Sequence, residues 1–243
     1  AGERIARAAE TALQGLATAE ADAIWVGRRR RARLRVALGV HDGTALALAL
    51  SKLVEEVAPG TDVEFVRAGA RGALVLVRRD EADAAVLPAV AEASGLAIRP
   101  LFEDRLVAVL PPEDGLPDPV AASEISRRRY LTYGLFPQEG WEYERFFRAG
   151  QQYPAEIVKV ESTELICAMV ASGDGVSILP RASAAGAAAS GRVRLAELAG
   201  AAIRFSWSLV SPRRPAPETA ACLDGLGRAG QRLGTRVLGA GDR

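Results

Sequence analysis

Apolar positions over the first 26 residues follow a helical pattern. They are separated alternately by four and three residues, and they are Ile5, Ala9, Ala12, Leu16, Ala19 and Ala23. This spacing is typical of a helix that packs along another helix, although an Ala-rich helix also matches it by chance. The pattern predicts a dimerising helix. It leads into Arg28–Arg35, which holds six arginines in eight positions and is typical of a solvated collar rather than a phosphate contact.

Beyond the collar, apolar runs alternate with helical patterns. The predicted strands of the first half are 34–38, 62–66, 84–88 and 106–110. Apolar residues on one face predict a helix from Thr44 to Val57, and a shorter helix is expected over 70–79. Strands separated by helices favour parallel βαβ units with right-handed crossovers. The first half is therefore expected to form one α/β unit.

A proline-rich segment, 111–119, predicts a hinge before a second α/β unit. The elements expected in that unit are strands 130–133, 157–160 and 176–179 and helices 139–148 and 162–171. A long alternating strand, 205–210, and a final helix, 217–237, supply what the first unit needs to complete its sheet. The chain is thus expected to leave the first unit, build the second and return. Two crossings of this kind produce a hinged cleft.

The composition of the chain excludes several classes of protein. With 49% hydrophobic residues, and 31 basic against 30 acidic residues, the chain can bury a core and is not a polyanion-binding surface as a whole. Its N-terminus does not resemble a secretory signal, and no stretch reaches the ~18 apolar residues of a membrane span. Two cysteines make no disulfide framework, and a single histidine makes no zinc pair. We therefore expect a cytoplasmic protein without metal or cofactor.

Several motifs resemble the regulatory region of LysR-type transcriptional regulators. They are 1–5, 34–37, 59–64, 101–107 and 170–180, and the last, VASGDGVSILP, is the most specific. The resemblance covers essentially the whole chain. Segments 130–133 and 160–165 are similar to the homocysteine-responsive regulators of methionine synthesis, which usually carry a proline where Gly134 stands here.

The resemblance implies an α/β fold like that of type II periplasmic binding proteins, in which two Rossmann-like subdomains hold an effector between them. The implied parts are a linker helix at 1–30, a first subdomain at 31–110 with 208–243, and a second at 111–207. It also implies self-association into dimers or tetramers. Promoter DNA would be bound by a winged helix-turn-helix upstream of Ala1.

Ligands of open α/β sheets lie beyond the carboxyl ends of the strands, and helix N-termini there favour carboxylates. The candidate effector-binding residues at such ends are His41, Asp42, Gly43, Thr44, Ala68, Gly69, Tyr133, Gly134, Phe136, Glu161, Ser162 and Thr163. For Thr44, Ser162 and Thr163, helix capping alone is an equally good interpretation. An acidic or amino-acid metabolite is the expected effector; the sub-family resemblance points to homocysteine, and an aromatic acid remains open.

Two other functions are compatible with a two-subdomain α/β fold. A periplasmic solute-binding protein would share the fold, but it gives no reason for the heptad helix or the arginine collar. An enzyme would need convergent acid, base or nucleophilic groups, and the sequence shows no second histidine, no GxSxG motif and no metal-spaced cluster. The sequence therefore favours a regulator's effector-binding domain that is not an enzyme.

Overall fold

The structure is a computed structural model of all 243 residues. It describes residues 32–39, 44–68, 72–88, 90, 93–134 and 141–239, together with seven residues between positions 6 and 19. Contacts divide the chain into a first unit, 1–32, and a second unit, 33–243. The seven described residues between positions 6 and 19 are helical, and Leu13 and Leu16 among them are exposed. Ile5, Ala12 and Ala23 of the predicted heptad seam and residues 28–31 of the arginine collar lie outside the described residues.

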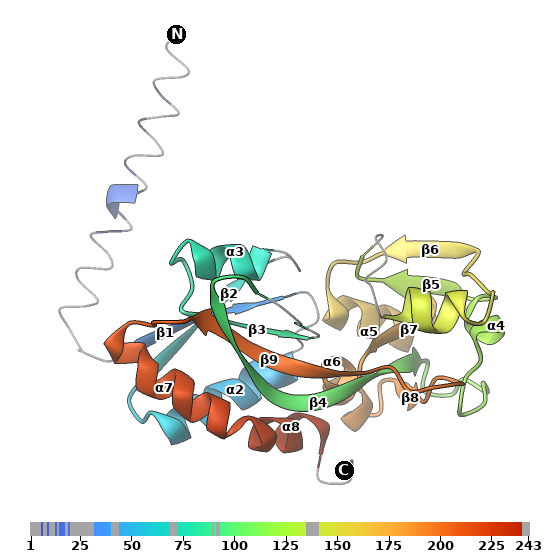
Figure 1. Ribbon diagram of the computed structural model, residues 1–243. Helices are drawn as coiled ribbons and strands as arrows, with labels where there is room; N and C mark the ends of the chain where they lie inside the picture. Colours follow the sequence, from blue (N-terminus) through green and yellow to red (C-terminus); the bar gives the residue numbers. More distant parts are fainter. Residues whose placement is uncertain are drawn as a thin grey trace. The chain divides into compact units, whose positions relative to one another are not determined.

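The second unit is built on a seven-stranded sheet (Figure 1). Six of its strands follow the order β2-β1-β3-β9-β4-β7, and the seventh, β8, pairs with β4. Strands β1 (Arg33–Leu38), β2 (Asp62–Arg67) and β3 (Ala84–Pro88) pair in parallel, as the sequence predicted. Strands β4 (Leu96–Leu110) and β9 (Arg204–Pro212) run antiparallel to each other through the unit. They are the two crossing strands.

The second sheet is smaller than predicted. Among the described residues it contains β5 (Arg129–Thr132) and β6 (Glu156–Lys159), which pair in parallel. Strand β7 (Ser177–Pro180) lies beside β5 at its start, where Val176 forms a parallel bridge with Tyr130. The strand itself pairs antiparallel with the second half of β4, as does β8 (Arg194–Ala196). The part of β4 that pairs with these two strands, 106–110, is the strand that the sequence predicted. The ten residues of β4 before it, 96–105, were not predicted as strand, and they pair with β9.

The helices mostly follow the predicted pattern. They are α2 (Thr44–Val57), α3 (Gly72–Arg78), α4 (Ala122–Ile125), α5 (Thr163–Ala171), α6 (Arg181–Ala189), α7 (Pro217–Arg228) and α8 (Gly230–Leu238). Four features differ from the predictions, and one of them is α4, which was not expected. The helix expected over 139–148 is described only from Glu142 and is a π-helix, η1, over Tyr143–Arg148. The final helix breaks at Ala229, and α6 was not predicted.

Apolar side chains form two large cores. The first gathers residues of β1, α2, β9, α7 and α8, and the second gathers residues of β5, β7, α5 and η1. Helix α6 contributes to both, because Ala182 lies in the first core while Ala184 and Ala187 lie in the second. A third, smaller cluster lies between α3 and β3. We call the parts around the first and second cores subdomain I and subdomain II; their exact limits stay a prediction.

None of the helices in the described part of the chain has the length and apolar content that crossing a bilayer requires.

Candidate functional site

In subdomain I, the predicted site residues lie at the carboxyl edge of the parallel strands. The backbone N–H of Ala68, just after β2, donates to the carbonyl of Leu38 at the end of β1, at 3.0 Å. Thr44 begins α2, the helix that follows β1. Ala68 and Thr44 therefore both belong to the edge at which ligands of such sheets are bound. His41, Asp42, Gly43 and Gly69 lie outside the described residues.

In subdomain II, two further groups of predicted residues lie at one edge. The Val160 N–H donates to the Thr132 carbonyl at 2.7 Å, which brings the ends of β5 and β6 side by side. Tyr133 and Gly134 follow β5, while Glu161, Ser162 and Thr163 follow β6 and lead into α5. The structure thus brings together these five residues, which the sequence placed on separate segments. Phe136 lies outside the described residues.

Ser162 has a structural role. Its side chain is the N-cap of α5 and accepts a hydrogen bond from the Leu165 N–H at 3.3 Å. Thr163, the first residue of the helix, is buried. Glu161 is exposed and pairs with Lys159, whose hydrogen bond lowers the pKa of the Glu161 carboxyl. The capping interpretation of Ser162 is therefore confirmed. Replacing its side chain changes the stability of α5 as well as any contact with a ligand.

A contact between the two subdomains joins the helix N-termini. The backbone N–H of Thr44, at the start of α2, donates to Oε1 of Glu164 in the first turn of α5, at 3.3 Å. The Thr44 hydroxyl itself makes no hydrogen bond with the described residues. The N-terminal N–H groups of a helix carry partial positive charge, which favours a carboxylate at this place. Glu164 supplies one from the opposite subdomain.

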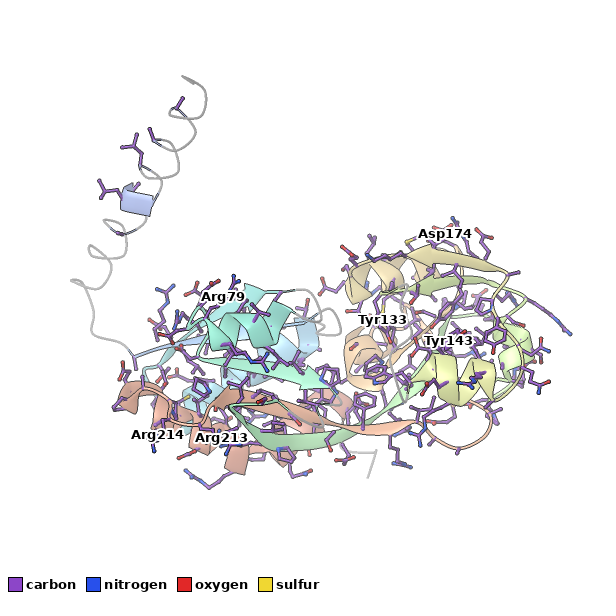
Figure 2. All side chains as sticks on the ribbon, turned by 45° about the horizontal axis from the view of Figure 1, so that its top comes forward. Arg79, Tyr133, Tyr143, Asp174, Arg213 and Arg214 are labelled. Atoms are coloured by element: carbon purple, nitrogen blue, oxygen red, sulfur yellow. The ribbon has the colours of Figure 1, made fainter. Side chains whose placement is uncertain are left out.

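Tyr133 points away from solvent (Figure 2). Its hydroxyl lies 3.3 Å from both carboxylate oxygens of Glu142, and its ring meets Trp141 edge-on with centroids 6.4 Å apart. Burial raises the pKa of Tyr133 well above its ordinary value, and the neighbouring Glu142 charge adds to the shift. Burial likewise raises the pKa of Glu142 to about 7, against the hydrogen bond from Tyr133. An effector contact of Tyr133 stays a prediction.

Glu142 and Glu164 are the residues that sequence reasoning missed. Each lies near a helix start, where an acidic residue is ordinary and carries no signal of its own. The contact between Glu164 and Thr44 spans 120 residues of chain, so no local pattern could reveal it.

The cysteines and acidic side chains of the described residues form no nucleophilic or metal-binding site. Cys167 and Cys222 are both buried and free, and burial raises the pKa of the Cys167 thiol to about 11. That thiol is therefore protonated at neutral pH and a poor nucleophile. Among the described residues, no group of three histidine, cysteine or acidic side chains is arranged to hold a metal ion. The residues at the two sheet edges are suited to binding an anion by hydrogen bonds.

The sequence-family model of the LysR substrate binding domain matches residues 27–230 of this chain. The chain belongs to this family. No curated protein sequence matches the chain. Among solved structures, a full-length OxyR variant from Pseudomonas aeruginosa has a TM-score of 0.68 at 20% identity, covering 92% of this chain and 77% of that one.

A regulatory domain and an effector binding domain of known structure are also similar. The MetR regulatory domain from N. meningitidis has a TM-score of 0.63 at 19% identity, covering 86% of this chain and 96% of that one. The effector binding domain of QuiR in complex with shikimate has a TM-score of 0.69 at 16% identity, with coverages of 83% and 98%. These likenesses confirm the predicted two-subdomain fold of a LysR-type effector-binding domain.

Proposed function

We propose that the chain senses a small acidic metabolite at the edges where α2 and α5 begin, and that this binding alters promoter recognition by a DNA-binding part of the full-length regulator. The observation that carries the proposal is the hydrogen bond from the Thr44 N–H to the Glu164 carboxylate. It supports an anion-accepting position at the first helix N-terminus, between the two subdomains. Family membership supports a regulatory rather than a catalytic role.

The class of effector follows from the same groups. A carboxylate suits the α2 N-terminus, and the related QuiR domain binds shikimate, a carboxylic acid. The likeness to a MetR regulatory domain keeps homocysteine among the candidates. A periplasmic solute-binding protein remains the alternative, but membership of the LysR family favours the regulator. We further propose a cytoplasmic location and a homo-oligomer formed through the linker helix that the sequence predicts at 1–30.

A thermal-shift screen tests the proposal. The chain is heated with small carboxylic and amino acids, including shikimate and homocysteine, and a ligand that binds only the native state raises the midpoint in a saturable way. The variant Thr44→Val, which removes a hydroxyl that makes no hydrogen bond with the described residues, is expected to weaken binding about tenfold, or ~1.4 kcal/mol.

The matched control is Thr235→Val on α8, where the hydroxyl donates only to the Gln231 carbonyl of its own helix. This control is expected to bind the metabolite as tightly as the wild type. Flat melting curves for every acid contradict the proposed effector class. Equal losses of affinity in both variants contradict the position of the site.

A further inference from the structure

A cavity of about 390 Å³ lies in subdomain I, away from the candidate effector site. Its walls come from the end of α3, the turn into β4 and the connection from β9 to α7. Asp83, which precedes β3, lines it, as does Pro212, the last residue of β9. The cavity is therefore at the amino end of β3, whereas Thr44 and Ala68 follow the carboxyl ends of β1 and β2. The two places are separate sites.

Two arginines line this cavity from different walls. Arg78 ends α3, and Arg214 belongs to the connection before α7. Neither side chain makes a hydrogen bond or ion pair with any residue that the structure describes. Two guanidinium groups that line one cavity without a described partner are suited to an anion, because each offers a fork of N–H donors to carboxylate or phosphate oxygens.

The acidic residues of the cavity are already engaged. Arg35, on β1, forms an ion pair with Asp83, with 2.9 Å between Nη2 and Oδ1, and its backbone N–H donates to Asp83 Oδ2 at 2.7 Å. The same guanidinium donates to the Asp80 carbonyl at 2.7 Å and lies 3.7 Å from the Asp80 carboxylate. Arg35 thus neutralises Asp83, while the Asp80 carboxylate keeps its charge at the rim of the cavity. With Arg78 and Arg214, the ionisable side chains of the cavity and Arg35 carry one net positive charge.

The lining arginines are exposed, and each has an exposed arginine beside it in the sequence, Arg79 and Arg213. Figure 2 shows Arg213 beside Arg214. Ala216, which also lines the cavity, is the N-cap residue of α7 and offers no side-chain cap. The partial positive charge of that helix end adds to the charge of the arginines, and Glu218 in the first turn of α7 offsets part of it. Apolar side chains, among them Val77, Leu96 and Pro215, complete the wall.

We propose that this cavity binds a small organic anion, with its phosphate or carboxylate group between Arg78 and Arg214 and its uncharged part against the apolar wall. The volume of about 390 Å³ falls in the range of ~300–1,000 Å³ that is usual for small-molecule sites. The site is independent of the proposed effector site, so a second metabolite can act on the same domain.

The test measures binding of two probes, pyrophosphate and citrate, by isothermal titration calorimetry at fixed ionic strength. We expect saturable binding of one of them, and the probe that binds distinguishes a phosphate from a carboxylate ligand. The double variant Arg78→Gln with Arg214→Gln is expected to weaken this binding at least tenfold. Arg214→Lys, which keeps the charge but loses the fork, is expected to weaken it less.

The matched control is the double variant Arg145→Gln with Arg148→Gln. Both residues are exposed on η1, and their side chains likewise make no ion pair or hydrogen bond within the described part of the chain. This control removes the same charge, so equal losses in both double variants would show general attraction and overturn the proposal. Absence of binding by the wild type would do so too.

Two further outcomes distinguish an anion site in this cavity from DNA binding and from anion binding in the candidate effector site. If neither probe binds but a short DNA duplex does, and Arg78→Gln with Arg214→Gln abolishes that binding, the arginines contact a DNA backbone and the proposal is wrong. Thr44→Val is expected to leave binding of the anion unchanged. A loss there would place the anion in the candidate effector site and overturn the separate cavity.

Discussion

The indole N–H of Trp207 donates a hydrogen bond to the carboxylate of Asp104, with 2.9 Å between Nε1 and Oδ2, and both side chains are buried. The same oxygen accepts the Ala182 N–H at 3.1 Å, where α6 begins. Burial raises the pKa of Asp104, and these hydrogen bonds oppose the shift. One carboxylate therefore ties β4, β9 and α6 together at the place where the crossing strands and the two cores meet.

We expect Asp104→Ala to lower the free energy of unfolding by about 3 kcal/mol, because it leaves two buried donors without an acceptor. The donors are the Trp207 indole and the Ala182 amide. Unfolding in urea at constant pH, followed by far-UV circular dichroism, measures the change.

The control for this prediction lies one residue away. Glu103 accepts a hydrogen bond from Ser206 across the same two strands, but this pair is exposed. Glu103→Ala is expected to change the free energy of unfolding by less than about 0.5 kcal/mol. If the two variants lose the same stability, the buried Asp104 has no special role in joining the strands.

Much of the fold could be predicted from apolar periodicity. Strand β3 is an apolar run buried on both faces, and α2 has one apolar stripe; in both, burial and local pattern agree. The first half of β4 was missed because charged residues such as Arg99 and Asp104 interrupt the run, and their partners, Asp224 and Trp207, lie far along the chain. Helix α6 is too rich in alanine to show a stripe.

The candidate site was predictable only in part. The strand ends and the Ser162 cap follow from turn and capping rules, which act over a few residues. The carboxylate of Glu164 at Thr44 depends on how two subdomains meet, and the burial of Glu142 depends on packing around Tyr133. No rule on neighbouring residues contains that information. The sequence therefore predicted the sheet edges, but not that the Glu164 and Glu142 carboxylates lie at Thr44 and Tyr133.

A close backbone approach gives the next prediction. A Cβ at Gly230, in α8, would lie 2.6 Å from the Cα and carbonyl oxygen of Leu101 on β4. Backbone atoms cannot move aside as a side chain does, so Gly230→Ala is expected to lower the free energy of unfolding by about 2 kcal/mol through overpacking. Thermal unfolding by calorimetry measures it.

Gly227→Ala is the matched control on the preceding helix. Its added Cβ would meet only the Arg99 side chain, at 3.0 Å from Cδ, and that flexible chain can shift. Because alanine favours a helix interior by about 1 kcal/mol over glycine, this variant is expected to be as stable as the wild type or more so. A loss as large as that of Gly230→Ala would contradict the packing of α8 on β4.

The carboxyl of Glu142 makes stability depend on pH. Its pKa is raised from 4.5 to about 7, so the folded state holds a proton that the unfolded state releases between these values. The stabilisation is fully present below pH 4.5 and is lost as the pH rises through 7. From pH 6 to pH 8 we expect the free energy of unfolding to fall by about 1 kcal/mol from this group. Urea unfolding at a series of pH values measures it.

Glu142→Gln removes this titration and is expected to flatten the profile between pH 6 and pH 8. Glu55→Gln serves as the control, since Glu55 is exposed on α2 and its side chain makes no hydrogen bond or ion pair within the described residues. It is expected to keep the wild-type profile. A Glu142→Gln profile that falls as steeply as that of the wild type would assign the pH dependence to another group.

Glu164 competes with an acidic effector if the proposed site is right, because its carboxylate already accepts the Thr44 N–H. Glu164→Gln keeps the size of the side chain and an acceptor oxygen but removes the charge that opposes a second carboxylate. We expect it to tighten binding of the acid found in the thermal-shift screen by about threefold to tenfold, equal to ~0.7–1.4 kcal/mol. Titration calorimetry of the wild type and the variant measures the two dissociation constants. Asp174→Asn, which removes an exposed charge of subdomain II beyond the end of α5, is expected to leave the affinity unchanged. Weaker binding by Glu164→Gln would mean that this carboxylate holds the two helix N-termini in the binding geometry instead of occupying the place of the effector.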